Sequence, residues 1–489
     1  MDDFRSSVKK IMVVFLFLFV ALISYIAYFQ LFEAPSIAED QGNKRLWAER
    51  NKILRGPIYD RAGNVLTKGE RTGVLTQSRE YVGGSLYVHA LGYINQKYGL
   101  TGLEESYDKE LSTYSSVGTG IRTFFKDLTI ESFKEAFKAR GEEEEKIGNG
   151  IITTLDKDIQ KAAFDALGDR KGAVVALNPK TGEVLAMVSK PDYDPNNLDV
   201  AITSANTGSG DDSPLINRAI NGKYPPGSTF KIITTESALN NMPDVTSRIF
   251  HDTGKLVFNS SYSLSNAGGA VNGDINLKSA FQLSSNFVYG TLAGELGNEK
   301  LKTTAESFGF NNSIPAAGFT ISQSKFPALE SYEVGMIAQC GIGQSSIEAT
   351  PMQMALVAST IANDGVMMRP KLVNKVVDMK GNVVETIEDK KYKEVISTSD
   401  AATIKEYMVN LVNKNNPASL SGMNIAGKTG TADHLDTNGN NAIPHSWFIA
   451  FAPADNPKIA VAVIVESGGY GATAAAPVAA EVIKAALSK

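Results

Sequence analysis

The sequence has a single cysteine, Cys340, in 489 residues, so no disulfide can form within the chain and a thiolate zinc site lacks ligands. Its four histidines show no metal-ligand spacing such as His-x-x-x-His. We find no glycine-rich nucleotide loop and no carboxylate pair of the kind that hydrolyses glycosides. The net charge of −5 gives no cationic surplus for nucleic acid. We expect no cofactor, no resident metal and no nucleic-acid partner, although His434, between Asp433 and Asp436, leaves a surface metal open.

The first feature that is present is an uncharged apolar run at residues 11–32. A helix of this length spans about 33 Å, enough for the hydrocarbon core of a bilayer. Arg5, Lys9 and Lys10 precede it, which places the N-terminal tail, residues 1–10, in the cytoplasm. A cleaved secretory signal is the alternative, but its apolar region is shorter and ends in small rather than aromatic residues. We predict a single-pass plasma-membrane anchor with the rest of the chain outside the cytoplasm.

The length of 489 residues allows two to four domains. After the anchor comes a polar, helix-prone stretch at residues 36–55, and residues 55–66 then have the pattern of strand, turn and strand. Residues 112–150 are polar and contain one amphipathic helical pattern at 130–139 and an acidic run at 142–145. We predict a first extracytoplasmic module over residues 36–150.

The region from residue 151 to 489 has strand patterns at both ends and helical patterns between them. A strand pattern at 151–155 precedes a helical one at 157–167, and hairpin patterns join 173–177 to 183–189 and 447–451 to 459–465, before a closing helix at 473–488. This order predicts one mixed α/β domain. The Lys-Thr-Gly at 180–182 falls in the first hairpin turn, so we assign it no chemistry.

Three short motifs occur in one order: Ser-x-x-Lys at Ser228 and Lys231, Ser-x-Asn at Ser284 and Asn286, and Lys-Thr-Gly from Lys428. Each motif is weak alone, because Ser228 would ordinarily be a helix N-cap and the other two would be polar turns. As a set they are typical of serine acyltransferases that penicillin acylates. The set supplies a nucleophile, a base, a proton relay and a carboxylate clamp.

Pro225, Pro226 and Gly227 interrupt the chain before Ser228, and a helical pattern follows. Ser228 therefore begins a helix, and Lys231 lies one turn later on the same face. A serine hydroxyl needs a base to remove its proton, and a lysine amine can do so only when neutral. We predict Ser228 as the nucleophile and Lys231 as the base, with its pKa lowered by burial and by a second cation.

The remaining motif residues complete the expected site. We assign Ser284 to proton relay between Lys231 and the leaving amine, and Asn286 to orienting Lys231 and binding the substrate backbone. The Lys-Thr-Gly segment should form an edge strand in which Lys428 is the second cation. On that strand we expect Gly430 to let the substrate backbone approach closely, and the hydroxyls of Thr429 and Thr431 to bind a terminal carboxylate. The backbone N–H of Thr431, together with that of Ser228, would form an oxyanion hole.

The chain resembles the class B penicillin-binding proteins, the monofunctional peptidoglycan D,D-transpeptidases. The resemblance covers nearly the whole sequence and includes two signatures of the family's N-terminal pedestal. Besides the three motifs, the matching segments are Arg55-Gly56-x-Ile58-x-Asp60-Arg61-x-Gly63, Gly99-Leu100-Thr101-Gly102-Leu103-Glu104 through Tyr107-Asp108, 224–232, 341–344 and 350–355. The resemblance implies an α+β transpeptidase domain with an antiparallel sheet flanked by helices at 151–489, and a dimerisation-type pedestal at 36–150.

The resemblance also implies a donor stem peptide ending in D-Ala-D-Ala, acylation by β-lactams, and work beside a polytopic membrane glycosyltransferase. An elongation role and a division role both stay open, as does the acceptor amine, lysine or diaminopimelate. Three rivals share part of the pattern: a class D β-lactamase, a D,D-carboxypeptidase and a noncatalytic β-lactam sensor. Class D enzymes usually have valine where this chain has Asn286, and carboxypeptidases usually lack an N-terminal pedestal.

Overall fold

The computed structural model describes residues 2–33, 47–48, 50–113, 146–207, 212–260, 262–415, 420, 422–435 and 438–488. The helix expected at 130–139, the acidic run at 142–145 and most of the stretch at 36–55 lie outside them.

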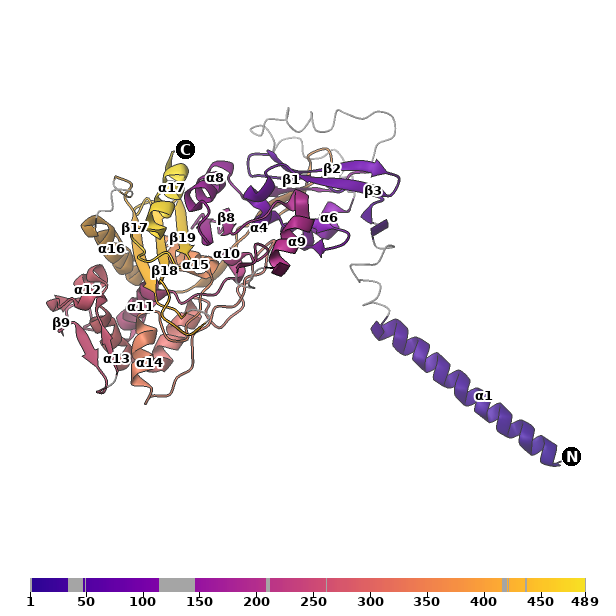
Figure 1. Ribbon diagram of the computed structural model, residues 1–489, viewed down its shortest axis with the longest axis horizontal. Coiled ribbons are helices and arrows are strands. Elements are labelled where there is room, and N and C mark those ends of the chain that lie inside the picture. The colour runs from indigo at the N-terminus through magenta and orange to yellow at the C-terminus, as the bar shows by residue number, and fades with distance from the viewer. Residues whose placement is uncertain are drawn as a thin grey trace.

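The apolar run forms one helix, α1 (Asp2–Tyr28), which continues as a π-helical turn (Phe29–Glu33) (Figure 1). Its most apolar window is 0% buried against the rest of the described chain. By length and composition it is the one helix among the described residues that could cross a membrane, as the sequence predicts.

The central element of the larger domain is a five-stranded antiparallel sheet. Its order is β17 (Ala426–Ala432), β18 (His445–Ala452), β19 (Ile459–Val465), β7 (Gly172–Leu177) and β8 (Val184–Lys190). β19 has the sequence IAVAVIV, and all of its residues are buried. Its β-branched side chains favour the strand conformation and pack on both faces of the sheet. Both expected hairpins are confirmed, and so is the turn at 180–182. β17 lies at the edge, as predicted.

Helices cover both faces of this sheet, which confirms the predicted fold class (Figure 1). α8 (Lys157–Leu167) and the closing helix α17 (Ala475–Leu487) pack together on one face. α15 (Pro351–Ala362) and the short α10 (Arg218–Asn221) pack on the other, and α16 (Thr398–Asn415) packs on β17.

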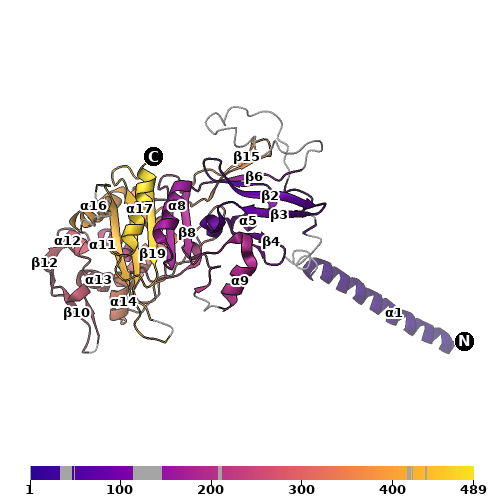
Figure 2. The same ribbon diagram turned by 45° about the horizontal axis from the view of Figure 1, so that its top comes forward.

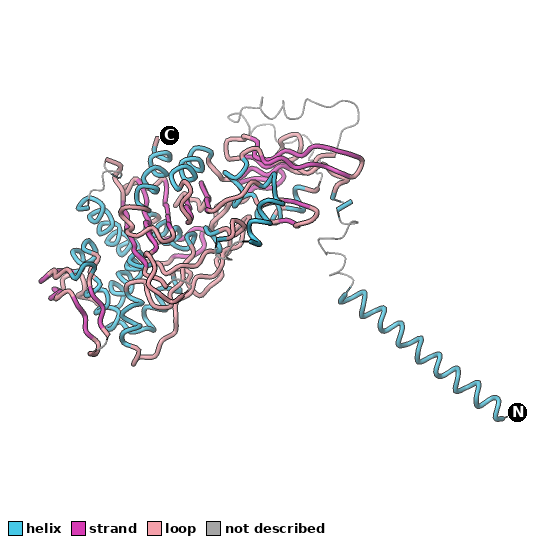
Figure 3. The backbone as a smooth tube through the Cα atoms, viewed as in Figure 1, coloured by secondary structure: helices cyan, strands magenta, loops and turns pink. Residues whose placement is uncertain are grey.

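A mainly helical lobe, whose helices are cyan in Figure 3, is joined to the edge strand β17 through the turn at Gly227–Phe230, which packs on that strand. It consists of α11 (Lys231–Asn241), α12 (Leu277–Leu283), α13 (Asn286–Ser307) and α14 (Val334–Gly341). Two small antiparallel ribbons are attached to it: β9 (Ile249–Asp252) with β12 (Gly273–Asn276), and β10 (Lys255–Val257) with β11 (Ser263–Ser265).

The N-terminal module is built on a six-stranded sheet that draws strands from both halves of the chain (Figure 2). The order is β15 (Val383–Thr386), β14 (Val373–Val377), β6 (Gly150–Thr153), β1 (Ile58–Tyr59), β2 (Val65–Gly73) and β3 (Thr76–Tyr81). Three of these strands, β6, β14 and β15, begin at or after residue 150, where the sequence predicts the boundary between the two domains. The two modules therefore share one sheet.

The remaining elements of the described chain are short. The helices are α4 (Val88–Leu91), α5 (Gly102–Ser106), α6 (Asp108–Leu111) and α9 (Leu198–Thr207), with 3₁₀ turns at Gly84–Tyr87, Pro195–Asn197 and Ala267–Gly269. Two ribbons pair β4 (Ile94–Asn95) with β5 (Gly99–Leu100) and β13 (Val366–Met368) with β16 (Lys391–Glu394).

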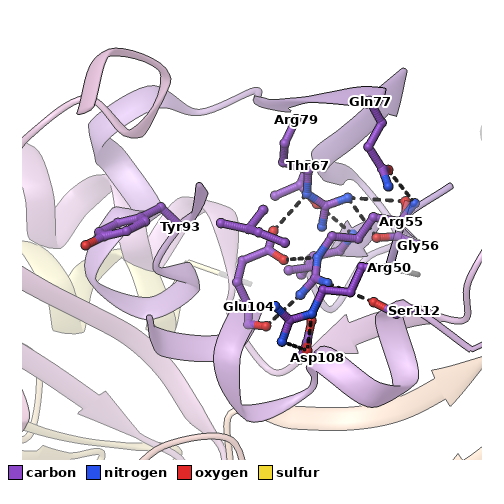
Figure 4. Close-up of polar contacts among 12 residues, drawn as sticks. Arg50, Arg55, Gly56, Thr67, Gln77, Arg79, Tyr93, Glu104, Asp108 and Ser112 are labelled. Carbon is purple, nitrogen blue, oxygen red and sulfur yellow. Dashed lines mark hydrogen bonds and ion pairs between the residues drawn. The ribbon is translucent and has the colours of Figure 1, made fainter. Parts of the chain in front are cut away.

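The two pedestal signatures meet in a buried ion-pair network (Figure 4). Arg55 Nε contacts Glu104 Oε2 at 2.6 Å, and Arg55 Nη1 contacts Asp108 Oδ1 at 2.6 Å. Arg79 Nε contacts the other Glu104 oxygen at 2.8 Å, and Arg50 contacts Asp108 at 2.7 Å. Arg55 and Glu104 are buried, so removing Glu104 would leave the Arg55 charge only partly compensated, by Asp108, which is strongly destabilising. The signatures thus hold the pedestal together.

A buried carboxyl on α11 predicts how stability depends on pH. Glu236 is 5% exposed, and its Oε2 has no hydrogen-bond partner. Burial, and then the charge of Asp400, raise the pKa of Glu236 to about 8. A raised pKa favours the protonated form in the fold, so this stability is present below the ordinary glutamate pKa and is lost as pH rises through about 8.

We expect Glu236→Gln to remove this loss, because glutamine cannot ionise. Its advantage over the wild type should be near zero at pH 4 and reach about 5 kcal/mol above pH 8, since the pKa rises from 4.5 to about 8 and each pKa unit is worth about 1.4 kcal/mol. Denaturant unfolding of both proteins across this range measures the difference. A pH-independent difference would contradict the ionisation of Glu236 as its cause.

Candidate active site

The predicted nucleophile lies in a tight turn. A 3₁₀ turn (Gly227–Phe230) leads directly into α11, so Ser228 does begin a helix. Gly227 has a φ of +54°, and a Cβ there would lie 2.5 Å from the carbonyl oxygen of Thr431. Glycine at this position therefore both permits the left-handed backbone and lets the strand β17 approach the nucleophile turn. Ser228 itself is half-buried.

Neighbouring segments anchor this turn. Trp447 Nε1 donates a hydrogen bond to the carbonyl of Pro225 at 3.0 Å, and the Gly227 N–H donates to the carbonyl of Gly343 at 2.8 Å. A Cβ on Gly343 would lie 2.1 Å from the carbonyl oxygen of Gly227. The 341–344 segment therefore has a local physical role, which is to support the backbone beneath Ser228.

Lys231 is fully buried at the start of α11, with three acceptors within hydrogen-bond distance of its Nζ. The Ser284 carbonyl oxygen lies 2.7 Å away, Ser284 Oγ 3.1 Å and Asn286 Oδ1 2.8 Å. Burial, and then the charge of Lys428, hold the pKa of Lys231 well below its usual value. Burial and a second cation are the two causes of a lowered lysine pKa that the sequence predicts here.

Ser284 lies between the two lysines. Its Oγ accepts hydrogen bonds from Lys231 Nζ at 3.1 Å and from Lys428 Nζ at 3.0 Å. The residue is the C-cap of α12 and adopts the left-handed conformation, with φ 53° and ψ 40°. This conformation costs a non-glycine residue of order 1–3 kcal/mol. Surrounding contacts must therefore hold Ser284 in place.

A hydrogen bond that the sequence does not indicate sets the orientation of the Asn286 amide. Asn286 Nδ2 donates at 2.8 Å to the carbonyl of Ser265, the last residue of strand β11. The amide oxygen consequently faces Lys231. The predicted orientation of Lys231 by Asn286 requires such a contact.

Lys428 is fully buried on the edge strand, and burial lowers its pKa to about 7. Thr429 and Thr431, two residues apart on that strand, share one face and are both half-buried. A Cβ on Gly430 would lie 2.9 Å from Thr229 Cγ2 and 3.0 Å from the Pro226 carbonyl oxygen. Glycine 430 thus lets β17 pack directly against the nucleophile turn.

Two aromatic rings that the motifs do not reveal surround the lysines. Lys231 Nζ lies 5.4 Å from the ring centroid of Tyr289, and Lys428 Nζ lies 5.7 Å from that of Phe281. The rings exclude water while offering their π faces to the cations. Tyr289 comes three residues after Asn286 on a helix, and that spacing is the one signal that could have identified it.

The structure therefore brings together Lys231, Ser284, Asn286 and Lys428 through direct contacts, and places Ser228 one helical turn before Lys231. Two buried amines with lowered pKa values share one hydroxyl. Such an arrangement can pass a proton from a nucleophile to a leaving group without a charged solvent-exposed base. No metal is needed for this chemistry.

The ring of His434 stacks on that of His445, with centroids 3.7 Å apart and planes 13° from parallel. Asp436, one of the two carboxylates that left a surface metal open, lies outside the described residues. Within the described residues no group of three histidine, cysteine, aspartate or glutamate side chains is placed to hold an ion.

Comparisons with known proteins show to which family the chain belongs. A family model described as "Penicillin binding protein transpeptidase domain" matches residues 172–484, and one described as "Penicillin binding protein A dimerisation domain" matches residues 55–129. Peptidoglycan D,D-transpeptidase PbpA of Mycolicibacterium smegmatis is 35% identical over 99% of both chains. Peptidoglycan D,D-transpeptidase MrdA of Acinetobacter baumannii is 28% identical over 81% of this chain and 64% of its own.

A solved structure extends the similarity to three dimensions. Penicillin-binding protein A from M. tuberculosis, in its penicillin G acyl-enzyme complex, matches with a TM-score of 0.76 and 34% identity. The match covers 89% of this chain and 100% of the other.

Proposed function

Since this chain belongs to the family of penicillin-binding protein transpeptidases, we propose how its own residues carry out the reaction of that family. The chain is a serine-type peptidoglycan D,D-transpeptidase and a β-lactam target. One observation supports the assignment of roles: Ser284 Oγ lies 3.1 Å from Lys231 Nζ and 3.0 Å from Lys428 Nζ. Three distant segments thus meet beside the turn that carries Ser228.

In the acylation step, neutral Lys231 accepts the proton of the Ser228 hydroxyl. Ser228 Oγ then attacks the penultimate carbonyl of a stem peptide ending in D-Ala-D-Ala. The backbone N–H groups of Ser228 and Thr431 stabilise the resulting oxyanion. The close approach of Gly227 to the Thr431 carbonyl supports this role, because it brings the two segments side by side.

Collapse of the intermediate breaks the peptide bond and releases D-Ala. Ser284 relays the proton from Lys231 to the departing amine, the hydroxyls of Thr429 and Thr431 hold the terminal carboxylate, and Lys428 supplies positive charge beside Ser284. An amine of a neighbouring stem peptide then attacks the ester, loses its proton through the same relay, and leaves a cross-link and a free Ser228. A β-lactam enters the same path by opening its ring, and its acyl-enzyme deacylates slowly.

We further propose how the chain is placed and divided. Residues 1–10 form the cytoplasmic tail and 11–32 the membrane anchor, with the pedestal at 36–150 and the transpeptidase domain at 151–489 outside the cytoplasm. The basic residues Arg5, Lys9 and Lys10, which precede the apolar run at 11–32, support this orientation. A polytopic membrane glycosyltransferase is the proposed partner, with the anchor and pedestal as its contact surfaces.

A donor–acceptor assay separates this function from its rivals. The purified full chain in detergent receives a D-Ala-D-Ala pentapeptide or a thioester donor, with and without a D-amino acid acceptor. We expect an acceptor-dependent exchange product by mass spectrometry. Hydrolysis alone would indicate a carboxypeptidase, rapid penicillin turnover a β-lactamase, and labelling without any turnover of donors a sensor.

A further inference from the structure

Asp252 is a buried carboxylate outside the three motifs, at the point where the two small ribbons of the helical lobe meet. It ends β9 and is 0% exposed. Its oxygens accept hydrogen bonds from Gly254 N–H at 2.8 Å, Asn272 Nδ2 at 2.6 Å, Asn266 Nδ2 at 2.9 and 3.0 Å, and Ser285 Oγ at 2.7 Å. All of these groups donate, which suits an ionised carboxylate because it only accepts.

Ser285 connects this carboxylate to the Ser-x-Asn motif, since it is the middle residue of that motif. Its Oγ donates to Asp252 and accepts from the Val288 N–H at 3.1 Å, which caps the N-terminus of α13. Asn286, the next residue, begins that helix. Asp252 therefore holds the helix end from which Asn286 reaches Lys231.

Asn266 provides a second connection. Its Nδ2 donates to Asp252, and its Oδ1 accepts from the Phe287 N–H at 3.0 Å. The residue before it, Ser265, accepts from Asn286 Nδ2. Asp252 at the end of β9, with Ser265 and Asn266 at the end of β11, thus holds three successive residues, Ser285 to Phe287, through three separate hydrogen bonds.

The geometry points to a role for this network in catalysis: we propose that Asp252 is a positioning residue, which keeps Ser284 and Asn286 in contact with the base Lys231. Ser284 is in the left-handed region, where a serine stays only when its surroundings hold it. The next residue, Ser285, is held by Asp252, so the carboxylate maintains the turn that presents the Ser284 carbonyl and hydroxyl. This inference rests on the proposed roles of Lys231, Ser284 and Asn286.

The charge state of Asp252 is consistent with this role. Burial would raise its pKa, but the hydrogen bonds from Asn272, Ser285, Gly254 and Asn266 outweigh burial and lower it. The carboxylate therefore remains ionised at the pH values where transpeptidation would occur. An asparagine of the same size would turn an NH₂ group toward these donors and lose part of the network.

The test compares Asp252→Asn and Asn266→Ala with the matched control Asn272→Ala. Asn272 Nδ2 donates a hydrogen bond of 2.6 Å to the same carboxylate, but Asn272 lies directly before β12 and not in the Ser-x-Asn turn. The measurement is the second-order rate of acylation by a fluorescent penicillin, across pH, with the full chain in detergent. We expect the acylation rate to fall about 10- to 100-fold in Asp252→Asn and Asn266→Ala, the loss that a catalytic group misplaced by about 1 Å causes. In the control it should fall less than about threefold.

The pH profile distinguishes positioning from a general loss of stability. When the turn moves away, Lys231 loses part of its burial, so its pKa rises toward the ordinary lysine value. The acidic limb of the acylation profile should then shift to higher pH in Asp252→Asn and Asn266→Ala but stay in place in Asn272→Ala. Equal rates and profiles in all three variants would overturn the proposal. Asn266→Ala leaves Asp252 paired with Ser285, so it preserves the test if Asp252→Asn does not fold.

A crystal structure of the Asp252→Asn or Asn266→Ala chain tests the inference independently of activity. We expect Ser284 to leave the left-handed region and Asn286 Oδ1 to move out of hydrogen-bond range of Lys231 Nζ. An unchanged turn would overturn the positioning role even if the enzyme is an active transpeptidase. A wild-type chain that no penicillin acylates would instead contradict the proposed function, whatever the turn does.

Discussion

Ser228→Ala is expected to abolish covalent labelling of the chain by a fluorescent penicillin. Alanine has no nucleophilic atom, and no water can take the place of the serine oxygen in an ester to the protein. The turn should survive, because its conformation depends on Gly227 and on the hydrogen bond from Trp447 Nε1 to the Pro225 carbonyl. Gel fluorescence and intact mass after incubation measure the loss.

The chain offers a matched control in another Ser-x-x-Lys sequence. Ser322 precedes Lys325 with the same spacing, but its hydroxyl donates to Asn221 Oδ1 at 3.0 Å. Ser322→Ala should therefore label as the wild type does. Label that survives in Ser228→Ala, or disappears in Ser322→Ala with normal thermal unfolding, would refute Ser228 as the nucleophile.

Lys231→Arg should reduce acylation by about 10²- to 10⁴-fold, the usual contribution of a general base. A guanidinium remains protonated at every accessible pH and cannot accept the serine proton. The substituted side chain can still donate hydrogen bonds toward the Ser284 carbonyl and Asn286 Oδ1, so a loss of rate would report the missing base. Stopped-flow acylation by a chromogenic cephalosporin measures it.

Lys371→Arg is the control for placing an arginine in a buried lysine site. Lys371 is 4% exposed, donates to the Ile387 carbonyl at 2.8 Å and pairs with Asp389 at 2.6 Å, on the pedestal side of the molecule. Its replacement should leave acylation unchanged. A Lys231→Arg enzyme as fast as this control would show that the proton leaves Ser228 by another route.

The order of the motifs and the hairpins around them allowed much of the site to be predicted. The Ser228 turn follows from the Pro-Pro-Gly break, and the edge position of β17 follows from the hairpin pattern after it. Both signals are local, because they depend on turn residues and on strand periodicity. The convergence of Lys231, Ser284 and Lys428 could be expected because the chemistry requires all three.

Other features depend on contacts between distant segments, which local patterns do not encode. β14 pairs with β6 in the pedestal sheet and β15 pairs with β14, although both strands lie more than 200 residues after β6. Asp252 is 32 positions before Ser284, in a segment without any recognised motif. Tyr289 and the Ser265 carbonyl likewise act through tertiary packing. The pedestal signatures were visible in the sequence, but the Arg55–Glu104 pairing that explains them was not.

Peptide mapping of the penicillin adduct tests the central claim most directly, since that claim is that three segments converge on one hydroxyl. The full chain is acylated with benzylpenicillin, digested and analysed by tandem mass spectrometry. We predict one added penicilloyl group, on the peptide that contains Ser228 and on that serine. An adduct on Ser284 or on any residue outside the 224–232 segment would contradict the account.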